Sequence, residues 1–311
     1  MPGRRSPREL ALELALALRE EIAPELGGHA GRAHAGAAQG GDVTFAIDAR
    51  AEAYLERFRV ERAPDLAFYS EDRGLVSPDG GADWVLVVDP IDGTRPAMAG
   101  LEAACVSVAA APLDGTPRMG DVQVGCVVEI KSGCVFLAER NRGVDPTPSL
   151  SANREVSRMF WSYGLRGRPV RVIAEVLGEL IDASSVGGAT FDLGSATYDM
   201  TRIVTGQLDA YIEPGPAIVA NVPGTRAEFE RVGGGVVLNN SPYDLAAACL
   251  ILEEAGAIVT DAEGKPLAER GLLGSGPDFQ ISCVAAANRE LHAAIVEELG
   301  AGIGRLRQKV G

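Results

Sequence analysis

The stretch Trp84-Val-Leu-Val-Val-Asp89-Pro90-Ile91-Asp92-Gly93-Thr94 decides how this 311-residue chain is interpreted. Its first five residues are apolar, which predicts a buried strand bounded by a turn. In an open α/β sheet such a strand delivers the next residue, Asp89, to the carboxyl edge, where ligands bind. Pro90 keeps Asp89 out of the helical region and stiffens the turn that follows.

Asp92 comes three residues after Asp89 and can fold back beside it. Two carboxylates held that closely repel each other unless a divalent cation lies between them. Oxygen ligands favour Mg²⁺ over zinc or copper. Gly93 and Thr94 then offer backbone amides and a hydroxyl to a phosphate. An ordinary surface β-turn explains the same residues, because Asp-Pro and Asp-Gly pairs are common in turns.

Further acids follow predicted elements elsewhere in the chain. Tyr69-Ser70-Glu71-Asp72 places two acids directly after a short apolar run, so Glu71 could share a metal with Asp89. Two acids at the solvent-exposed end of a strand would explain this pattern equally well. Asp244 lies in the predicted first turn of an apolar helix, where an acid also complements the helix dipole.

The formal charge of −14 sets limits on the partners of the chain. A surface of that sign repels nucleic acid and anionic membrane, so neither is expected to bind. An anionic substrate would also be repelled unless cations reversed the local field. Hydrophobic residues make up 46% of the chain, which is enough for a sizeable core.

The five cysteines are odd in number and form no C-x-x-C pair, which indicates buried, reduced thiols in a cytoplasmic protein. Cys134 and Arg140 have the spacing of a thiol phosphatase, but the residues between them are typical of a strand. The Leu/Ala-rich run at the N-terminus carries acids, which excludes a signal peptide or a membrane span. With only His29, His34 and His292 in the chain, no histidine-based mechanism is favoured.

The order of the predicted elements indicates two halves. Residues 1–165 would form an α+β half with an antiparallel sheet and the Asp89–Thr94 site. Residues 166–311 would form an α/β half that supplies Asp244 and residues facing the substrate. Irregular segments are expected at 27–41, at 143–169, where the crossover between the halves would lie, and at 214–240. The predicted helices are Leu10–Ile22, Asp48–Phe58, Val172–Ile181, Ser195–Thr205, Pro242–Ala255 and Arg289–Leu299. The predicted strands are Leu66–Ser70, Trp84–Val88, Ala103–Ala111, Val122–Ile130, Gly133–Ala138, a strand near Ser185, Leu208–Glu213, Ile258–Thr260 and Ile281–Ala286.

Taken together and in order, these segments resemble the inositol monophosphatase family, the lithium-sensitive type of sugar phosphatase. The resemblance is to its bacterial and archaeal branch, which includes fructose-1,6-bisphosphatases. Asp89–Thr94 is similar to the Asp-Pro-Ile/Leu-Asp-Gly-Ser/Thr signature, and Glu71-Asp72 to the acidic pair upstream of it. The other similar segments are Asp42–Glu52, Gly194–Ala196, Leu208–Glu213 and Asp244–Asp261.

The resemblance implies a layered αβαβα sandwich with two or three Mg²⁺ ions in the active site. Glu71, Asp89 and the Ile91 carbonyl would hold the first ion. Asp89, Asp92 and Asp244 would hold the second, and Glu71 would help to hold a third. The implied catalytic residues are Asp48, Glu71 and Thr94, of which Thr94 and Asp48 would orient and deprotonate the attacking water. The implied substrate-binding residues are Asp92, Gly93, Thr94, Ser195, Ala196, Glu213 and Asp244.

The function that follows is Mg²⁺-dependent hydrolysis of a small phosphate monoester, such as inositol monophosphate or fructose 1,6-bisphosphate, by a cytoplasmic homodimer. Such esters hydrolyse very slowly unaided, and metal ions stabilise both the attacking and the leaving oxygen. Two alternatives are a non-catalytic homologue that binds metal or a phosphorylated ligand, and a 3′-phosphoadenosine 5′-phosphate phosphatase.

The chain departs from the usual family pattern at several positions. Arg95–Met98 follows the signature where an Asn-Phe pair usually stands, and Tyr243 replaces a tryptophan. A lysine often found near the Gly27–Gly41 loop is absent, and the 214–240 connection is longer. Because of these departures, the resemblance does not identify the substrate.

Overall fold

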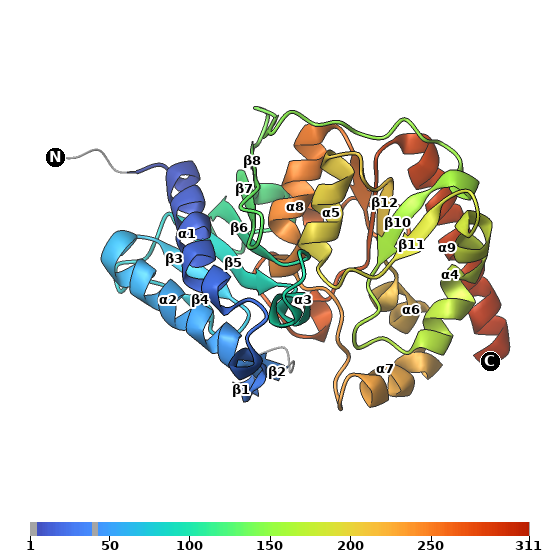
Figure 1. Cartoon of the computed structure of the whole chain (residues 1–311), viewed down its shortest axis with the longest axis horizontal. Helices are drawn as coiled ribbons and strands as arrows, with labels where there is room; N and C mark the ends of the chain where they lie inside the picture. The colour runs from blue at the N-terminus through green and yellow to red at the C-terminus, as the bar shows by residue number, and fades with distance from the viewer. Residues whose placement is uncertain (1–4, 39–42, 311) are drawn as a thin grey trace.

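A computed structural model describes residues 5–38 and 43–310 of the chain. Within these residues, helices and sheets alternate in layers along the longest axis of the molecule (Figure 1). Helices α1 and α2 cover one large sheet, α5 and α8 lie between this sheet and the second one, and α4 and α9 cover the far side. The αβαβα sandwich predicted from the sequence is therefore confirmed.

The first layer begins with a well-capped helix. The Ser6 hydroxyl accepts from the Glu9 amide at 3.2 Å, and the Glu9 carboxylate accepts from the Ser6 amide at 2.8 Å. The helix then packs one face on the sheet, burying Leu10, Leu14, Leu18 and Ile22, which are four residues apart. The helices of this layer are α1 (Pro7–Ile22) and α2 (Ala46–Arg62), both of which confirm predicted helices.

In the described residues the large sheet has the strand order β4-β3-β5-β6-β7-β8-β9, antiparallel except for the parallel pair β3–β5. Its inner strand β5 is buried on both faces, with Leu86 and Val88 toward α1 and α2, and Val85 and Val87 toward α8. The strands are β3 (Ala67–Ser70), β4 (Gly74–Val76), β5 (Trp84–Asp92), β6 (Cys105–Pro112), β7 (Val124–Glu129), β8 (Val135–Glu139) and β9 (Val144–Asp145).

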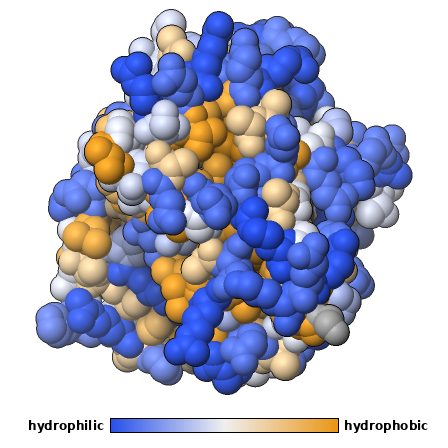
Figure 2. Space-filling view, turned by 90° about the vertical axis from the view of Figure 1, so that its right-hand side faces the viewer, coloured by the Kyte–Doolittle hydropathy of each residue, from blue (hydrophilic) through white to orange (hydrophobic). Residues whose placement is uncertain are grey.

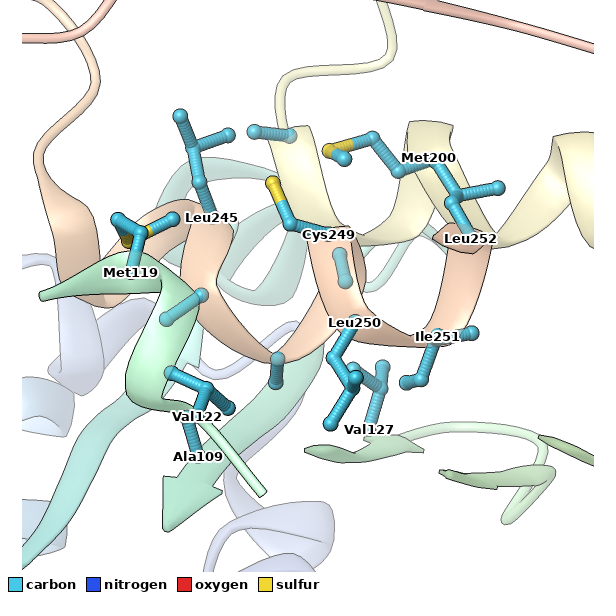
Figure 3. Close-up of a cluster of buried hydrophobic side chains, with 14 of the residues drawn as sticks. Ala109, Met119, Val122, Val127, Met200, Leu245, Cys249, Leu250, Ile251 and Leu252 are labelled. Carbon is cyan, nitrogen blue, oxygen red and sulfur yellow. The ribbon is translucent and has the colours of Figure 1, made fainter. Parts of the chain in front are cut away.

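The middle layer holds the largely buried helices α8 (Pro242–Ala255) and α5 (Ala196–Val204), which lie side by side. Figure 3 shows Leu252 of α8 next to Met200 of α5, while Leu250 points the other way, toward Val127 of the large sheet. A helix that is apolar on every side is stable only when it is covered on every side. Since α8 comes from the second half of the chain, its burial joins that half to the sheet of the first.

The second sheet has the order β11-β10-β12-β14-β13 in the described residues. Strands β11, β10 and β12 run parallel, and β14 runs antiparallel to both β12 and β13. Its strands are β10 (Phe160–Tyr163), β11 (Ala189–Phe191), β12 (Ala210–Glu213), β13 (Ile258–Thr260) and β14 (Cys283–Ala286). The remaining helices are α3 (Thr94–Ala99), α4 (Val170–Ser184), α6 (Gly215–Asn221), α7 (Arg226–Val232) and α9 (Arg289–Val310).

Several predicted elements are corrected by the structure. The strand expected near Ser185 is wrong, because α4 continues to Ser184 and the strand β11 begins only at Ala189. The 143–169 segment contains the strand β10, which was not predicted. The 214–240 segment contains α6 and α7. The division at residue 166 stays a prediction, although β10, which precedes it, pairs in the second sheet.

The segment expected to be an irregular loop, 27–41, is also corrected in its described part. His34–Ala37 forms strand β1, which pairs with β2 (Val43–Phe45) through backbone hydrogen bonds that need no particular side chains. Residues 39–41 and Asp42 lie outside the described residues. Cys134 is exposed, whereas Cys105, Cys126, Cys249 and Cys283 are buried as expected. Residues 135–139 between Cys134 and Arg140 form a strand, as predicted.

The outer face of the second half is mainly hydrophilic. Figure 2 shows charged and polar side chains over most of this face, with hydrophobic residues visible in separate places between them. No helix among the described residues is long and apolar enough to cross a membrane.

Gly125→Ala is predicted to destabilise the protein by about 2 kcal/mol or more, as small-to-large changes in a packed core do. A Cβ atom at Gly125 of β7 would lie 2.5 Å from the Ala247 carbonyl oxygen of α8, so the helix must move away from the sheet. Urea unfolding of the purified protein measures the change. The matched control is Gly300→Ala in α9, where an added Cβ meets nothing within 4 Å and helix propensity improves. Equal stability of the two variants would contradict close packing of α8 on β7.

Candidate active site

A bulge in β5 brings two aspartates to the same side of the large sheet. Asp89 pairs with Ser107 and Asp92 pairs with Cys105, so two residues of β5 oppose one residue of β6 between these pairs. In a regular strand, residues three apart point to opposite faces. The extra residue cancels this alternation, and Asp92 joins Asp89 on the side of α8. The Ile91 amide donates to Asp89 Oδ1 at 3.0 Å, which fixes the turn.

Gly93 ends the strand in a conformation that only glycine accepts here. Its φ is +91°, and an added Cβ would lie 2.4 Å from the Ala103 carbonyl oxygen and 2.9 Å from Ser195 Cβ. The chain therefore passes directly against the segment that carries Ser195. Thr94 follows as the first residue of α3.

Asp244 reaches the same place from the N-terminus of α8. Its Oδ2 accepts a hydrogen bond from the Ser241 amide at 2.5 Å, which completes a capping box. Asp244 therefore caps the helix, and the same carboxylate also faces Asp89 and Asp92, in a group of acids that could hold a metal ion. Pro242 in the first turn supports the helix start.

Asp89, Asp92 and Asp244 each place one carboxylate oxygen within 4.8 Å of the others. Asp89 and Asp92 are buried, and Asp244 opens onto a cavity that all three line. Burial, followed by the charges of the neighbouring acids, raises the pKa of Asp89 well above its usual range. Burial and the charge of Asp92 raise the pKa of Asp244 to about 7. A divalent cation would remove this repulsion, and an all-oxygen donor set of this kind fits a hard cation.

Glu71 lies where β3 ends, next to the bulge of β5. It lines the cavity beside Asp89, and its negative charge contributes to the raised pKa of Asp89. A smaller cavity adjoins the first through Glu71, Asp89 and Thr94 and extends to Asp48. The structure therefore brings Glu71 to the acids with which the sequence grouped it.

Thr94 and Asp48 are in direct contact. The Thr94 hydroxyl lies 2.9 Å from Asp48 Oδ1 and 3.2 Å from the Ile91 carbonyl oxygen. A hydroxyl has one proton, and the shorter contact to the charged acceptor is the stronger one. Asp48 is held from the other side by the Phe45 amide, which donates to Oδ2 at 2.9 Å at the start of α2. Thr94 and Asp48, which the resemblance pairs, are thus in contact, and the Ile91 carbonyl oxygen lies beside them.

The N-terminus of α5 orients Asp92. Asp92 Oδ2 accepts from the Ser195 hydroxyl at 2.8 Å and from the Thr197 amide at 2.6 Å. The Thr197 hydroxyl donates in turn to the Asp244 carbonyl oxygen at 3.0 Å. These contacts join the bulge of the large sheet to the two central helices. Ser195 and Ala196 line the cavity beside Asp92, and the substrate-facing role that the resemblance implies for them stays a prediction.

Glu213 is placed differently from the other predicted substrate-binding residues. It is fully buried and forms an ion pair with Arg168, and its Oε1 accepts from the Gly215 amide at 2.8 Å. Arg168, rather than Glu213, lines the cavity. None of the three histidines of the chain, all of which are described, lines either cavity, and buried His292 contacts Thr260 instead.

The model of the inositol monophosphatase family matches residues 5–303. The chain belongs to this family. A fructose-1,6-bisphosphatase/inositol-1-monophosphatase of Methanothermobacter thermautotrophicus is 28% identical over 242 residues, which are 74% of this chain and 74% of that protein. A putative Nus factor SuhB of Neisseria meningitidis is 25% identical over 267 residues, 84% of this chain and 86% of that one.

Solved structures of inositol monophosphatases have the same fold. The structure of the enzyme from Thermotoga maritima has a TM-score of 0.68 and 19% identity, and the match covers 97% of this chain and 98% of that one. An inositol monophosphatase–fructose 1,6-bisphosphatase gives a TM-score of 0.72 at 18% identity and covers 94% of this chain and 100% of that one. At such identities the likeness supports the layered architecture alone.

Sequence reasoning missed one wall of this family member's cavity. The missed lining residues include many polar or charged ones: Tyr163, Arg166, Arg168, Asp192, Asp199, Tyr211, Asn239, Asn240 and Gln280. The Gly164–Arg168 segment follows β10 directly, and polar residues after a buried strand were the signal used successfully at Asp89. Because β10 was not predicted, the polar residues that follow it were not recognised as candidate site residues.

The metal-free protein is predicted to lose stability as the pH rises from about 4 to about 7. Asp244 ionises at about pH 7 when folded, but near its ordinary pKa of about 4 when unfolded. The folded state therefore holds a proton that the unfolded chain releases, so the free energy of unfolding falls through this window. Chemical unfolding in a chelating buffer measures it.

Adding a divalent cation at pH 8 should restore the stability lost there, because the ion binds the ionised carboxylates of the folded state only. Asp244→Asn should show a flatter pH dependence and a smaller response to the ion. A pH-independent stability of the chelated protein would contradict the close approach of these acids.

Proposed function

We propose that this chain is a Mg²⁺-dependent phosphatase that hydrolyses a small phosphate monoester, of the inositol monophosphate or fructose 1,6-bisphosphate type. The observation that carries the proposal is the meeting of Asp89, Asp92 and Asp244 next to the Thr94–Asp48 pair. The three aspartates could hold cations, and the Thr94–Asp48 pair could accept a proton from water. Relatives bearing the names inositol-1-monophosphatase and fructose-1,6-bisphosphatase support the substrate class.

Under this proposal, Glu71, Asp89 and the Ile91 carbonyl would hold one Mg²⁺, and Asp89, Asp92 and Asp244 a second. Glu71 would help to hold a third. These groups supply oxygen donors only, and the raised pKa values of the aspartates show that the site favours compensation of their charge. When bound, Mg²⁺ supplies positive charge to the phosphate and lowers the pKa of water.

Thr94 and Asp48 have the geometry of a proton relay. With its own proton directed at Asp48 Oδ1, the Thr94 oxygen is left with lone pairs that can accept from a water O–H. As the water oxygen bonds to phosphorus, its proton passes to Thr94 Oγ1 and the Thr94 proton to Asp48 Oδ1. The ester P–O bond breaks with its electron pair on the alcohol oxygen, which takes a proton from solvent water as it leaves, and Asp48 returns its proton to solvent.

The remaining residues position the two ends of the substrate. The amides of Gly93 and Thr94 would meet the phosphate. Ser195 and Ala196 would face the alcohol, with Asp92 and Asp244 between the two ends. Glu213 would act through Arg168, whose guanidinium it holds in the cavity wall.

The alternative of a non-catalytic, ligand-binding homologue has a counterpart among the relatives, since some are named Nus factor SuhB. The Thr94–Asp48 contact counts against it, because a binding protein has no need of a positioned proton acceptor. No feature of the described cavity is specific for adenine, so a 3′-phosphoadenosine 5′-phosphate phosphatase is less favoured. We further expect a cytoplasmic homodimer, which size-exclusion chromatography with light scattering would test.

Asp89→Asn is predicted to lower Mg²⁺-dependent release of phosphate from inositol 1-phosphate or fructose 1,6-bisphosphate by about 10³-fold or more, because one charged ligand of both cation positions is lost. Phosphate release by purified protein, with and without Mg²⁺, measures the effect. The matched control is Asp65→Asn, an exposed aspartate before β3, which should keep full activity.

If the unaltered protein releases no phosphate from a panel of monoesters at any Mg²⁺ concentration, the catalytic proposal fails. Tight calorimetric binding of the same compounds without turnover would then favour the binding homologue.

A further inference from the structure

Glu52 is a buried carboxylate that takes no part in the proposed reaction. It lies on α2 one turn after Asp48, and it is only 5% exposed. Both side chains line the smaller cavity. Residues four apart on a helix share a face, so two acids in these positions repel each other. Burial raises the pKa of Glu52 to about 7, because its charged form loses hydration. Glu52 is therefore costly where it stands.

The partners of Glu52 lie before and after Glu71, in the segment that joins β3 to β4. The Ser70 hydroxyl donates to Glu52 Oε2 at 3.0 Å, and Arg73 Nε donates to the same oxygen at 3.2 Å. Glu71 and Asp72 lie between these two residues. One carboxylate oxygen of α2 therefore bonds to both ends of the short segment that carries Glu71.

The loop is also attached to β2, the strand that leads into α2. The Thr44 hydroxyl of β2 donates to Asp72 Oδ1 at 2.9 Å. Ser70 pairs with Gly74, whose φ of +67° suits the end of a three-residue hairpin loop. Within this loop Asp72 and Arg73 are thus held by β2 and α2, whereas Glu71 lines the main cavity.

The pleat of β3 explains why the loop is held on one side of the sheet and used on the other. Phe68 belongs to the core under α1 and α2, and Tyr69 to the core around α8. Side chains alternate along a strand, so Ser70 points toward α2, and Glu71 follows on the side of Asp89. There the charge of Glu71 raises the pKa of Asp89, which means that the two acids repel each other. A loop that carries a repelled acid moves outward unless it is fixed from behind.

We propose that Glu52 is a positioning residue, which fixes the loop 70–73 so that Glu71 stays at the cation site against the repulsion of the aspartates. This inference rests on the proposed function, in which Glu71 holds the first Mg²⁺. Because Asp48 lies on the same helix, α2 would set the positions of both the proton acceptor and this ligand. Loss of a group that orients a metal ligand typically lowers metal affinity by roughly 10- to 100-fold.

Calorimetric titration with Mn²⁺ at pH 8 tests the proposal without turnover. Glu71→Gln removes the ligand itself and so identifies the binding that depends on Glu71. Glu52→Ala removes both contacts to the loop and should weaken that binding by roughly 10-fold or more. Glu52→Gln keeps an oxygen for the Ser70 hydroxyl and loses only the charge that attracts Arg73, so it should weaken the binding less.

A double-mutant cycle shows whether Glu52 acts through Glu71. In the Glu71→Gln protein, adding Glu52→Ala should change the remaining Mn²⁺ affinity by less than about threefold, since the ligand that Glu52 positions is already lost. Additive losses of affinity in the double variant would overturn the positioning role. So would an unchanged affinity in Glu52→Ala alone.

Urea unfolding in a chelating buffer separates positioning from a general structural role. Replacing a buried charge with a neutral group of the same shape is often neutral or stabilising, so Glu52→Gln should be at least as stable as the unaltered protein. The matched control is Glu61→Gln, an exposed glutamate in the last turn of the same helix, which should change neither stability nor Mn²⁺ affinity. A Glu52→Gln protein that loses stability and Mn²⁺ affinity together would contradict the proposal.

Phosphate release separates failure of this role from failure of the catalytic proposal. With p-nitrophenyl phosphate, Glu52→Ala should raise the Mg²⁺ concentration for half-maximal activity by roughly 10-fold, while kcat at saturating Mg²⁺ stays within about threefold. A fall in kcat that excess Mg²⁺ does not restore would place the effect on Asp48 and overturn the proposal.

The unaltered protein distinguishes the remaining outcomes. If it binds Mn²⁺ but releases no phosphate, the catalytic proposal fails, and the calorimetric cycle alone decides on Glu52. If it hydrolyses p-nitrophenyl phosphate and the Glu52 variants keep its Mn²⁺ affinity, only the positioning role is rejected. A protein that binds no Mn²⁺ would reject both.

Discussion

The mutual repulsion of acids in one enclosed site is the constraint on which the rest of the structure depends. Asp89, Asp92 and Asp244 have oxygens within 4.8 Å of one another, and Glu71 lies close enough to raise the pKa of Asp89 further. Such an arrangement costs stability in the absence of cations, so the surrounding fold must hold it in place. The backbone provides this support, through a bulge in β5 and through amide groups at the starts of α5 and α8.

The layered architecture follows from the same requirement. The bulge belongs to the large sheet, whereas α5 and α8 come from the second half of the chain and lie between the two sheets (Figure 1). Burial of α8 on every side fixes where its N-terminus lies, and therefore where Asp244 lies. Helix N-termini favour negative charge, which partly offsets the repulsion. Core packing around α8 therefore sets the position of Asp244, so a substitution that shifts α8 would also change the geometry of the site.

The local conformations that position Asp89 and Asp244 could be predicted from the sequence. The apolar run before Asp89, the proline after it and the cap around Asp244 each predict a local conformation, and the structure has them. The cavity wall formed by the segment after β10, which includes Arg166 and Arg168, could not be predicted in this way. It depends on β10, a four-residue strand that is stable only because β11 and β12 pair with it. Glu213 shows the same limit: its position behind Arg168 is set by contacts between distant segments.

The central claim is that the acids gathered around Asp89 are a divalent-cation site. Anomalous diffraction from crystals grown at pH 8 and soaked in Mn²⁺ tests it most directly, because the ion is located without reference to activity. The account predicts a peak coordinated by the carboxylates of Asp89, Asp92 and Asp244, and the loss of that peak in Asp244→Asn crystals. A cluster that remains without anomalous density while Mn²⁺ occupies sites elsewhere would contradict it.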